Sequence, residues 1–97
     1  MSGHMEPIRF AGQIRYWDPI RSIGLAVVDI PAAHVQALGG LRQQRVRGTL
    51  GGIEFPSNAM PAGNGRLALS VSKAMMAAAR RTVGDDAEFV IMRVGRD

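Results

Sequence analysis

The 97-residue sequence has no cysteine, one tryptophan, one tyrosine, three phenylalanines and a single lysine. Without cysteine there is no disulfide framework, no thiolate nucleophile and no zinc-finger ligand set. A metal site would have to be built from carboxylates, and their spacing in the sequence indicates none. We therefore predict a protein that holds neither a metal nor a cofactor.

Long apolar runs are also missing. The longest, "IGLAVVDI" and "FVIM", are far shorter than the roughly 20 residues that span a bilayer. No charged start followed by an apolar core and a cleavage site opens the chain. We expect a cytoplasmic protein with no membrane partner. The start "MSGHM" is typical of a cloning scar, so residues 1–4 are predicted to be tag-derived and residues 5–97 to form one domain.

The charge is moderately basic, at +4 from 12 basic and 8 acidic residues. Such a balance can attract nucleic acid or another polyanion. No run of adjacent basic residues exceeds Arg80-Arg81. Two interpretations stay open, scattered solvated charge or one basic surface made by the strand residues Arg9, Arg15, Arg45 and Arg47.

Alternating and β-branched segments predict a mainly β protein. Apolar and polar residues alternate over 8–14, and "LAVVDI" at 25–30 is typical of a strand buried on both faces. Gly51-Gly52 is a hairpin signal, and Gly63-Asn64-Gly65 predicts a turn before the next strand. Further strands are expected over 44–50, 52–56, 66–71 and 87–94.

Two segments have helical character. Pro31 suits a first helical turn over 31–40, which Gly39-Gly40 would end. Ser72 is the expected N-cap of a second helix over 73–83, with Gly84 as its C-cap. Six short strands and two short helices predict a small closed β-barrel. The glycines at 63 and 65 lie too far before Ser72 to cradle a phosphate at the helix start.

From "VRGTLGGIEFP" to the final Asp97, the chain resembles a small bacterial domain of unknown function that is often found beside YdeI/OmpD-associated domains. The resemblance extends back to Ile8, since Trp17 and Pro31 are also similar to the family. It implies a closed six-stranded barrel of the double-split type, which AbrB-type transcription factors also use. The family supplies no activity. The residues that carry the resemblance are Val46, Gly48, Gly52, Phe55, Pro61, Gly63, Gly65, Lys73, Gly84, Asp85 and Asp97.

No catalytic set assembles from the sequence. His34 is the only histidine outside the scar, so few general bases are available. Asp85 and Asp86 lie in a predicted turn, where carboxylates usually accept hydrogen bonds from their own backbone. Asp29 and Glu54 lie in strands and would have raised pKa values if buried. A binding site at a barrel end is the alternative, with Trp17 as its anchor and a helix start that favours anions. Its predicted residues are Trp17, Ser57, Asn58, Arg66 and Lys73, beside a pocket of Met60, Met75 and Met76.

Three functions remain open at this stage. The first is a noncatalytic accessory domain that binds a small anionic ligand or a partner. The second is an AbrB-like DNA-binding homodimer, and the third is a cofactor-independent enzyme acting on a small molecule in a barrel-end pocket. A homodimer is expected because a small barrel gains by burying apolar split edges.

Overall fold

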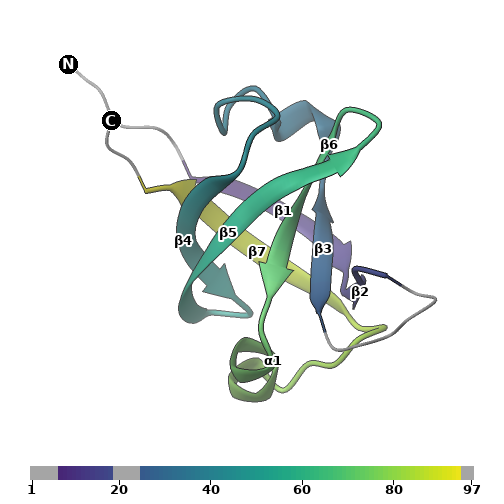
Figure 1. Cartoon of the computed structure of the whole chain (residues 1–97). Helices are drawn as coiled ribbons and strands as arrows, with labels where there is room; N and C mark the ends of the chain where they lie inside the picture. Colours follow the sequence, from purple (N-terminus) through teal and green to yellow (C-terminus); the bar gives the residue numbers. More distant parts are fainter. Residues whose placement is uncertain (1–6, 19–24, 95–97) are drawn as a thin grey trace.

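The computed structural model describes residues 7–18 and 25–94, and in them one sheet of seven strands, one α-helix and one 3-10 turn. Figure 1 shows a strongly curled sheet with α1 at one end. The elements are β1 (Ile8–Gln13), β2 (Arg15–Tyr16), β3 (Ala26–Ile30), η1 (Ala32–His34), β4 (Gln44–Leu50), β5 (Ile53–Gly63), β6 (Arg66–Val71), α1 (Lys73–Ala79) and β7 (Asp86–Arg93).

All neighbouring strands are antiparallel, in the order β1-β7-β4-β5-β6-β3-β2. The two strands at the ends of this order, β1 and β2, are separated in sequence by Ile14 alone. Ile14 exchanges backbone hydrogen bonds with the turn before β7, donating to Asp85 and accepting from Gly84. The chain therefore changes direction at Ile14. Before it, β1 pairs with β7, and after it, β2 pairs with β3.

Two hairpin turns form where the sequence predicts them. Gly51 and Gly52 have φ of 57° and 88° between β4 and β5, and Gly63, Asn64 and Gly65 have φ of 85°, 57° and 75° between β5 and β6. These left-handed conformations suit glycine and asparagine, and they match the twist of the paired strands.

β5 is longer than the predicted strand over 52–56, because it continues through Pro56 and Pro61 to Gly63. It pairs with β4 from Ile53 to Ala59, while its pairing with β6 begins only at Ala59. The missing N–H of Pro56 therefore interrupts no ladder on the β6 side. A proline is not tolerated in a strand that is hydrogen-bonded on both sides. It is compatible with this part of β5, which pairs with β4 alone.

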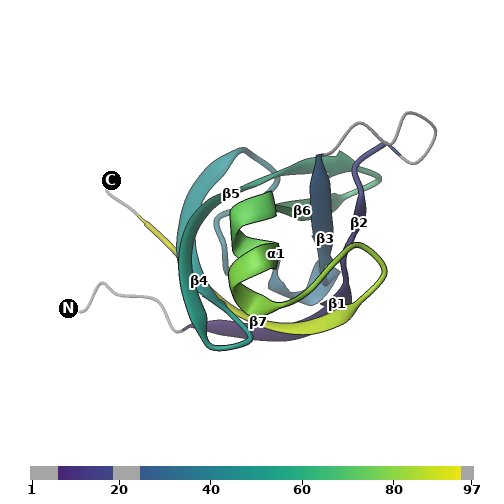
Figure 2. The same ribbon diagram turned by 90° about the horizontal axis from the view of Figure 1, so that it is seen from below.

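The core fills the inside of the curl. Phe89, Ile91, Val46, Leu50 and Leu69 are among its fully buried side chains. Beyond η1, Val35 and Leu38 join the core at one end, and Met75 of α1 joins it at the other. Figure 2 shows α1 lying across that end of the sheet. The side chains that point outward are consequently the ones available to partners.

The prediction of a closed six-stranded barrel with two helices was wrong in its detail, although the mainly β class is confirmed. The seven strands make one open, curled sheet, because β1 and β2 are two short strands with different partners. The helix expected over 31–40 is a 3-10 turn of three residues followed by turns. Most of its backbone hydrogen bonds join residues three apart, as from the Val35 N–H to the Ala32 carbonyl, so 3-10 turns form in place of an α-helix. Gly39 and Gly40 end the segment as predicted, with φ of 106° and 96°.

The second predicted helix is present but shorter. Ser72 is its N-cap, as expected, and its hydroxyl accepts a hydrogen bond of 3.0 Å from the Met75 N–H. The helix ends at Ala79 rather than near Val83, since Arg80 adopts a left-handed conformation with φ of 57°. Gly84 therefore does not cap the helix.

Candidate functional site

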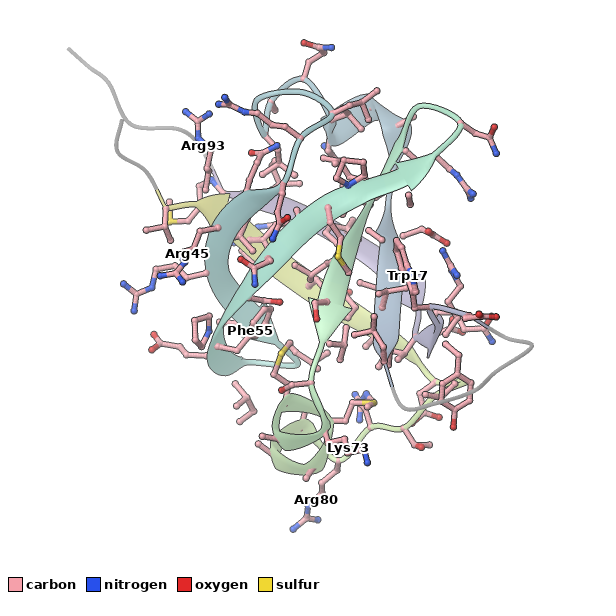
Figure 3. The ribbon with its side chains drawn as sticks, viewed as in Figure 1. Trp17, Arg45, Phe55, Lys73, Arg80 and Arg93 are labelled. Carbon is pink, nitrogen blue, oxygen red and sulfur yellow. The ribbon has the colours of Figure 1, made fainter. Side chains whose placement is uncertain are left out.

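The structure does not bring the five predicted site residues together. Trp17 follows β2 with 36% of its surface exposed, and its backbone N–H donates to the Leu25 carbonyl. Lys73 begins α1, and Figure 3 shows it near the helix end of the molecule while Trp17 lies beside β3. Arg66 opens β6, so the whole length of that strand, about 17 Å, separates it from Lys73.

The remaining two predicted residues belong to β5. The Ser57 hydroxyl donates to the Ser70 carbonyl at 2.5 Å, which ties β5 to β6. Asn58 is its exposed neighbour and lies opposite Arg45 of β4. Because successive side chains of a strand point to opposite faces, Ser57 and Asn58 do not share one surface. A single site made by all five residues stays a prediction without a geometric basis.

An ion pair stands on the outside of β2 and β3. The Arg15 guanidinium donates two hydrogen bonds of 2.9 Å to the two carboxylate oxygens of Asp29. These bonds, with the nearby charges of Arg15 and Arg66, hold the pKa of Asp29 below its ordinary value. Partial burial acts to raise the pKa of Asp29, as expected for a buried carboxylate, but the hydrogen bonds to Arg15 outweigh this loss of water.

We expect Asp29→Asn to lower the free energy of unfolding by roughly 0.5–1 kcal/mol at pH 7, since more than a third of each partner is exposed. The folded pKa of Asp29 is depressed, so this contribution is present above about pH 4 and disappears as pH falls through the folded pKa. Urea unfolding at pH 7 and pH 3 measures both values. Glu54→Gln, at an exposed carboxylate, is the matched control. A deficit that is equally large at pH 3 would contradict the assignment.

The outer surface of β5, β4, β7 and β1, which we call the four-strand face, has an apolar centre. Along β7, Phe89 and Ile91 point into the core, so Val90 and Met92 point outward, and both are half-buried. Val94, just beyond the strand, is 44% exposed. Such apolar side chains outside a sheet, bordered by charged ones, are typical of interaction surfaces.

A groove of about 360 Å³ runs along this face between β4 and β7. Its apolar lining comes from Pro7, Pro56, Val90 and Met92, and its polar lining from Arg47, Thr49 and Glu54. A smaller groove of about 260 Å³, between Arg9 and Glu88, meets it at Val90. We call the larger one the β4–β7 groove. Its volume is at the lower limit for a small-ligand site.

Charges of both signs border the groove. Arg45 and Arg47 alternate with buried residues along β4, and Arg9 does so on β1, with Glu54 and Glu88 on the same face. Within the described residues, Arg9, Arg47 and Glu54 make no ion pair with one another or with any other residue. Figure 3 shows Arg45 directed away from the sheet. Of the four arginines predicted for one basic surface, Arg15 lies elsewhere, paired with Asp29.

The sequence interpretation missed this face because "FVIM" is apolar on both sides. A strand whose inward and outward residues are both apolar is typical of the core, so the pattern does not indicate that Val90 and Met92 point to solvent. Their half-burial follows from the strand order, in which nothing in the described part of the chain covers β7 from outside.

The other polar candidates have structural contacts. The ring of His34 lies 6.5 Å from that of Phe10, and the Asp85 carboxylate accepts a 2.8 Å hydrogen bond from the Thr82 N–H, as a turn residue was predicted to do. Gln44, which was not one of these candidates, is buried, and its Nε2 donates to the Gly40 carbonyl. Residues 7–18 and 25–94 contain no cluster of three potential metal ligands. No helix in those ranges has the length and apolar character needed to cross a bilayer.

The chain matches a known protein family. A family whose description is "Domain of unknown function (DUF1905)" matches residues 10–91, which covers most of the chain. No curated protein matches the sequence. The predicted resemblance to a domain of unknown function is confirmed at that level.

Proposed function

We propose that this chain, which belongs to the DUF1905 family of domains of unknown function, is a noncatalytic binding domain that uses the β4–β7 groove. The observation that carries the proposal is the combination of an exposed apolar lining with unpaired charges at its border. Arginine and methionine are enriched at binding surfaces, where a guanidinium can hold an anion while a thioether adapts to an apolar shape. The ligand class that fits is an apolar body carrying an anionic group.

Anilinonaphthalenesulfonate, an apolar aromatic anion, is a direct probe of this site. At low micromolar protein we expect saturable fluorescence enhancement. We expect Met92→Lys to weaken binding at least tenfold by placing a charge in the apolar lining, and Arg47→Gln to weaken it severalfold by removing the cation. The fluorescence titration gives both dissociation constants.

The matched control is Met60→Lys, because Met60 is also a half-buried outward methionine, on β5 opposite Ala68 and away from the groove. Binding should be unchanged in that variant. Near-ultraviolet circular dichroism checks that every variant retains its fold, since the dye also binds loosely packed states. Equal losses in both methionine variants would reject the groove as the site.

Duplex DNA is a second candidate, suggested by the resemblance to AbrB-type factors and favoured by Arg9, Arg45 and Arg47 on one face. Glu54, Glu88 and Asp86 occupy the same face and would repel phosphate. DNA therefore ranks below a mixed-polarity ligand, and a steep loss of affinity with rising salt would reverse that order. The enzyme alternative has less support, because His34 contacts Phe10 rather than the groove. The predicted cytoplasmic location and YdeI/OmpD association stay predictions.

A further inference from the structure

The four-strand face contains a row of side chains whose two ends carry opposite charge. Glu54 of β5 pairs in register with Thr49 of β4, Thr49 with Val90 of β7, and Val90 with Arg9 of β1. Side chains paired across antiparallel strands point to the same face, so these four form a line across the sheet. Its order is acid, hydroxyl, apolar, base.

We propose that two copies of the chain pair through this face about a two-fold axis that runs along the strands between β4 and β7. The inference rests on the proposed function, because the second copy would occupy the β4–β7 groove and would be the partner that this groove binds. Such an axis exchanges β5 with β1 and β4 with β7. Glu54 then meets the partner's Arg9, Arg9 meets the partner's Glu54, and Thr49 lies over the partner's Val90.

The neighbouring row supports the same arrangement. In register it reads Pro56, Arg47 and Met92, and Pro7 lines the groove beside them. The axis places Pro56 over the partner's Pro7 and the aliphatic part of Arg47 over the partner's Met92. The apolar centres of both copies are buried together while the arginine head remains at the edge.

Charge balance favours a second copy over a partner of one sign. A strongly acidic partner would confront Glu54 and Glu88, and a strongly basic one would confront Arg9, Arg45 and Arg47. Within residues 7–18 and 25–94, neither Glu54 nor Arg9 has an ion-pair partner in its own chain. In the two-fold pair they form two symmetry-related ion pairs, one at each end of the row. Opposite charges at matching positions also exclude shifted arrangements.

The face is small. Four strands at about 4.8 Å spacing make it roughly 15 Å wide, and β1, β4 and β7, of six to eight residues, make it about 20–25 Å long. Its footprint is therefore roughly 300–400 Å², well below the area of about 800 Å² per partner that standard interfaces bury. The dimer is therefore weak and depends on concentration. We expect a dissociation constant on the order of 100 μM.

Sedimentation equilibrium at protein concentrations from about 10 μM to about 1 mM tests the pairing. We expect wild type to dimerise over this range, and Arg9→Glu and Glu54→Arg each to weaken dimerisation at least tenfold by opposing like charges. The double variant Arg9→Glu/Glu54→Arg should recover it, because each Arg9→Glu site again faces an opposite charge. An equimolar mixture of the two single variants should form a heterodimer. Arg80→Glu, on an exposed residue after α1, is the control and should behave as wild type.

Two outcomes overturn the proposal: a wild type that stays monomeric at about 1 mM, or a double variant that fails to recover association. If the wild type is monomeric while dye binding still depends on Met92 and Arg47, the groove binds another partner and only self-association is rejected. If both fail, the proposed function fails as well. Dye bound per chain should also fall as protein concentration rises, since dye and second copy occupy one face.

Discussion

Gly48→Ala is expected to prevent stable folding, or to lower the midpoint of thermal unfolding by at least 10 °C, a loss of about 3 kcal/mol or more. A Cβ atom at this position would lie 1.8 Å from the Val90 carbonyl oxygen and 2.8 Å from the Ile91 Cα. Both atoms belong to the backbone of β7, which pairs with β4 at this point. Neither can rotate away, so the two strands would have to separate.

Gly12→Ala is the matched control for a strand glycine. A Cβ there would lie 2.6 Å from Cγ2 of Val28, which is a side-chain methyl rather than backbone. A small shift of Val28 relieves the contact, so we expect Gly12→Ala to lower the free energy of unfolding by about 1–2 kcal/mol. The effect of Gly12→Ala should be smaller in a chain that also carries Val28→Ala, which removes the contacting methyl group. Thermal unfolding of the three variants gives the comparison. A Gly48→Ala protein as stable as Gly12→Ala would show that β4 does not approach β7 this closely.

Local chemistry explains the parts of the fold that the sequence predicts well. The glycine turns at 51–52 and 63–65 and the Ser72 cap depend on residues a few positions apart, and all three are present. The change of partner between β1 and β2 depends on one residue, Ile14, whose two backbone hydrogen bonds both go to the turn before β7, and no sequence pattern reports that. The helix expected over 31–40 is absent although Gly39 and Gly40 end the segment as predicted, because Val35 and Leu38 reach the core through turns without a helix.

The site is less predictable than the fold. Trp17, Ser57, Asn58, Arg66 and Lys73 were grouped by chemistry and by proximity to turns, but the strand order distributes them over several surfaces. The row of Glu54, Thr49, Val90 and Arg9 joins positions far apart in sequence, and only the pairing register brings them into line. Period-2 patterns say which residues of one strand share a face, but not which strands are neighbours.

Phe89→Ala is the second change with a large expected effect. Phe89 is fully buried and its ring stacks on that of Phe10, with centroids 5.4 Å apart and planes inclined by 14°. Truncation should cost about 3–5 kcal/mol, which is a large share of the total stability of a domain of this size. Urea unfolding measures the loss, and Phe89→Leu, which keeps most of the volume, should lose clearly less.

The stacked pair also allows a double-variant cycle. We expect a coupling energy of about 1 kcal/mol between Phe10→Ala and Phe89→Ala, because the rings lose their mutual contact only once. Additive losses would mean that each ring is stabilised by other neighbours instead. Since Val90 points outward from the same strand, Phe89→Leu should leave dye binding and self-association unchanged while lowering stability. Two adjacent residues of β7 would then have different roles: Phe89 stabilises the fold, and Val90 contacts a partner.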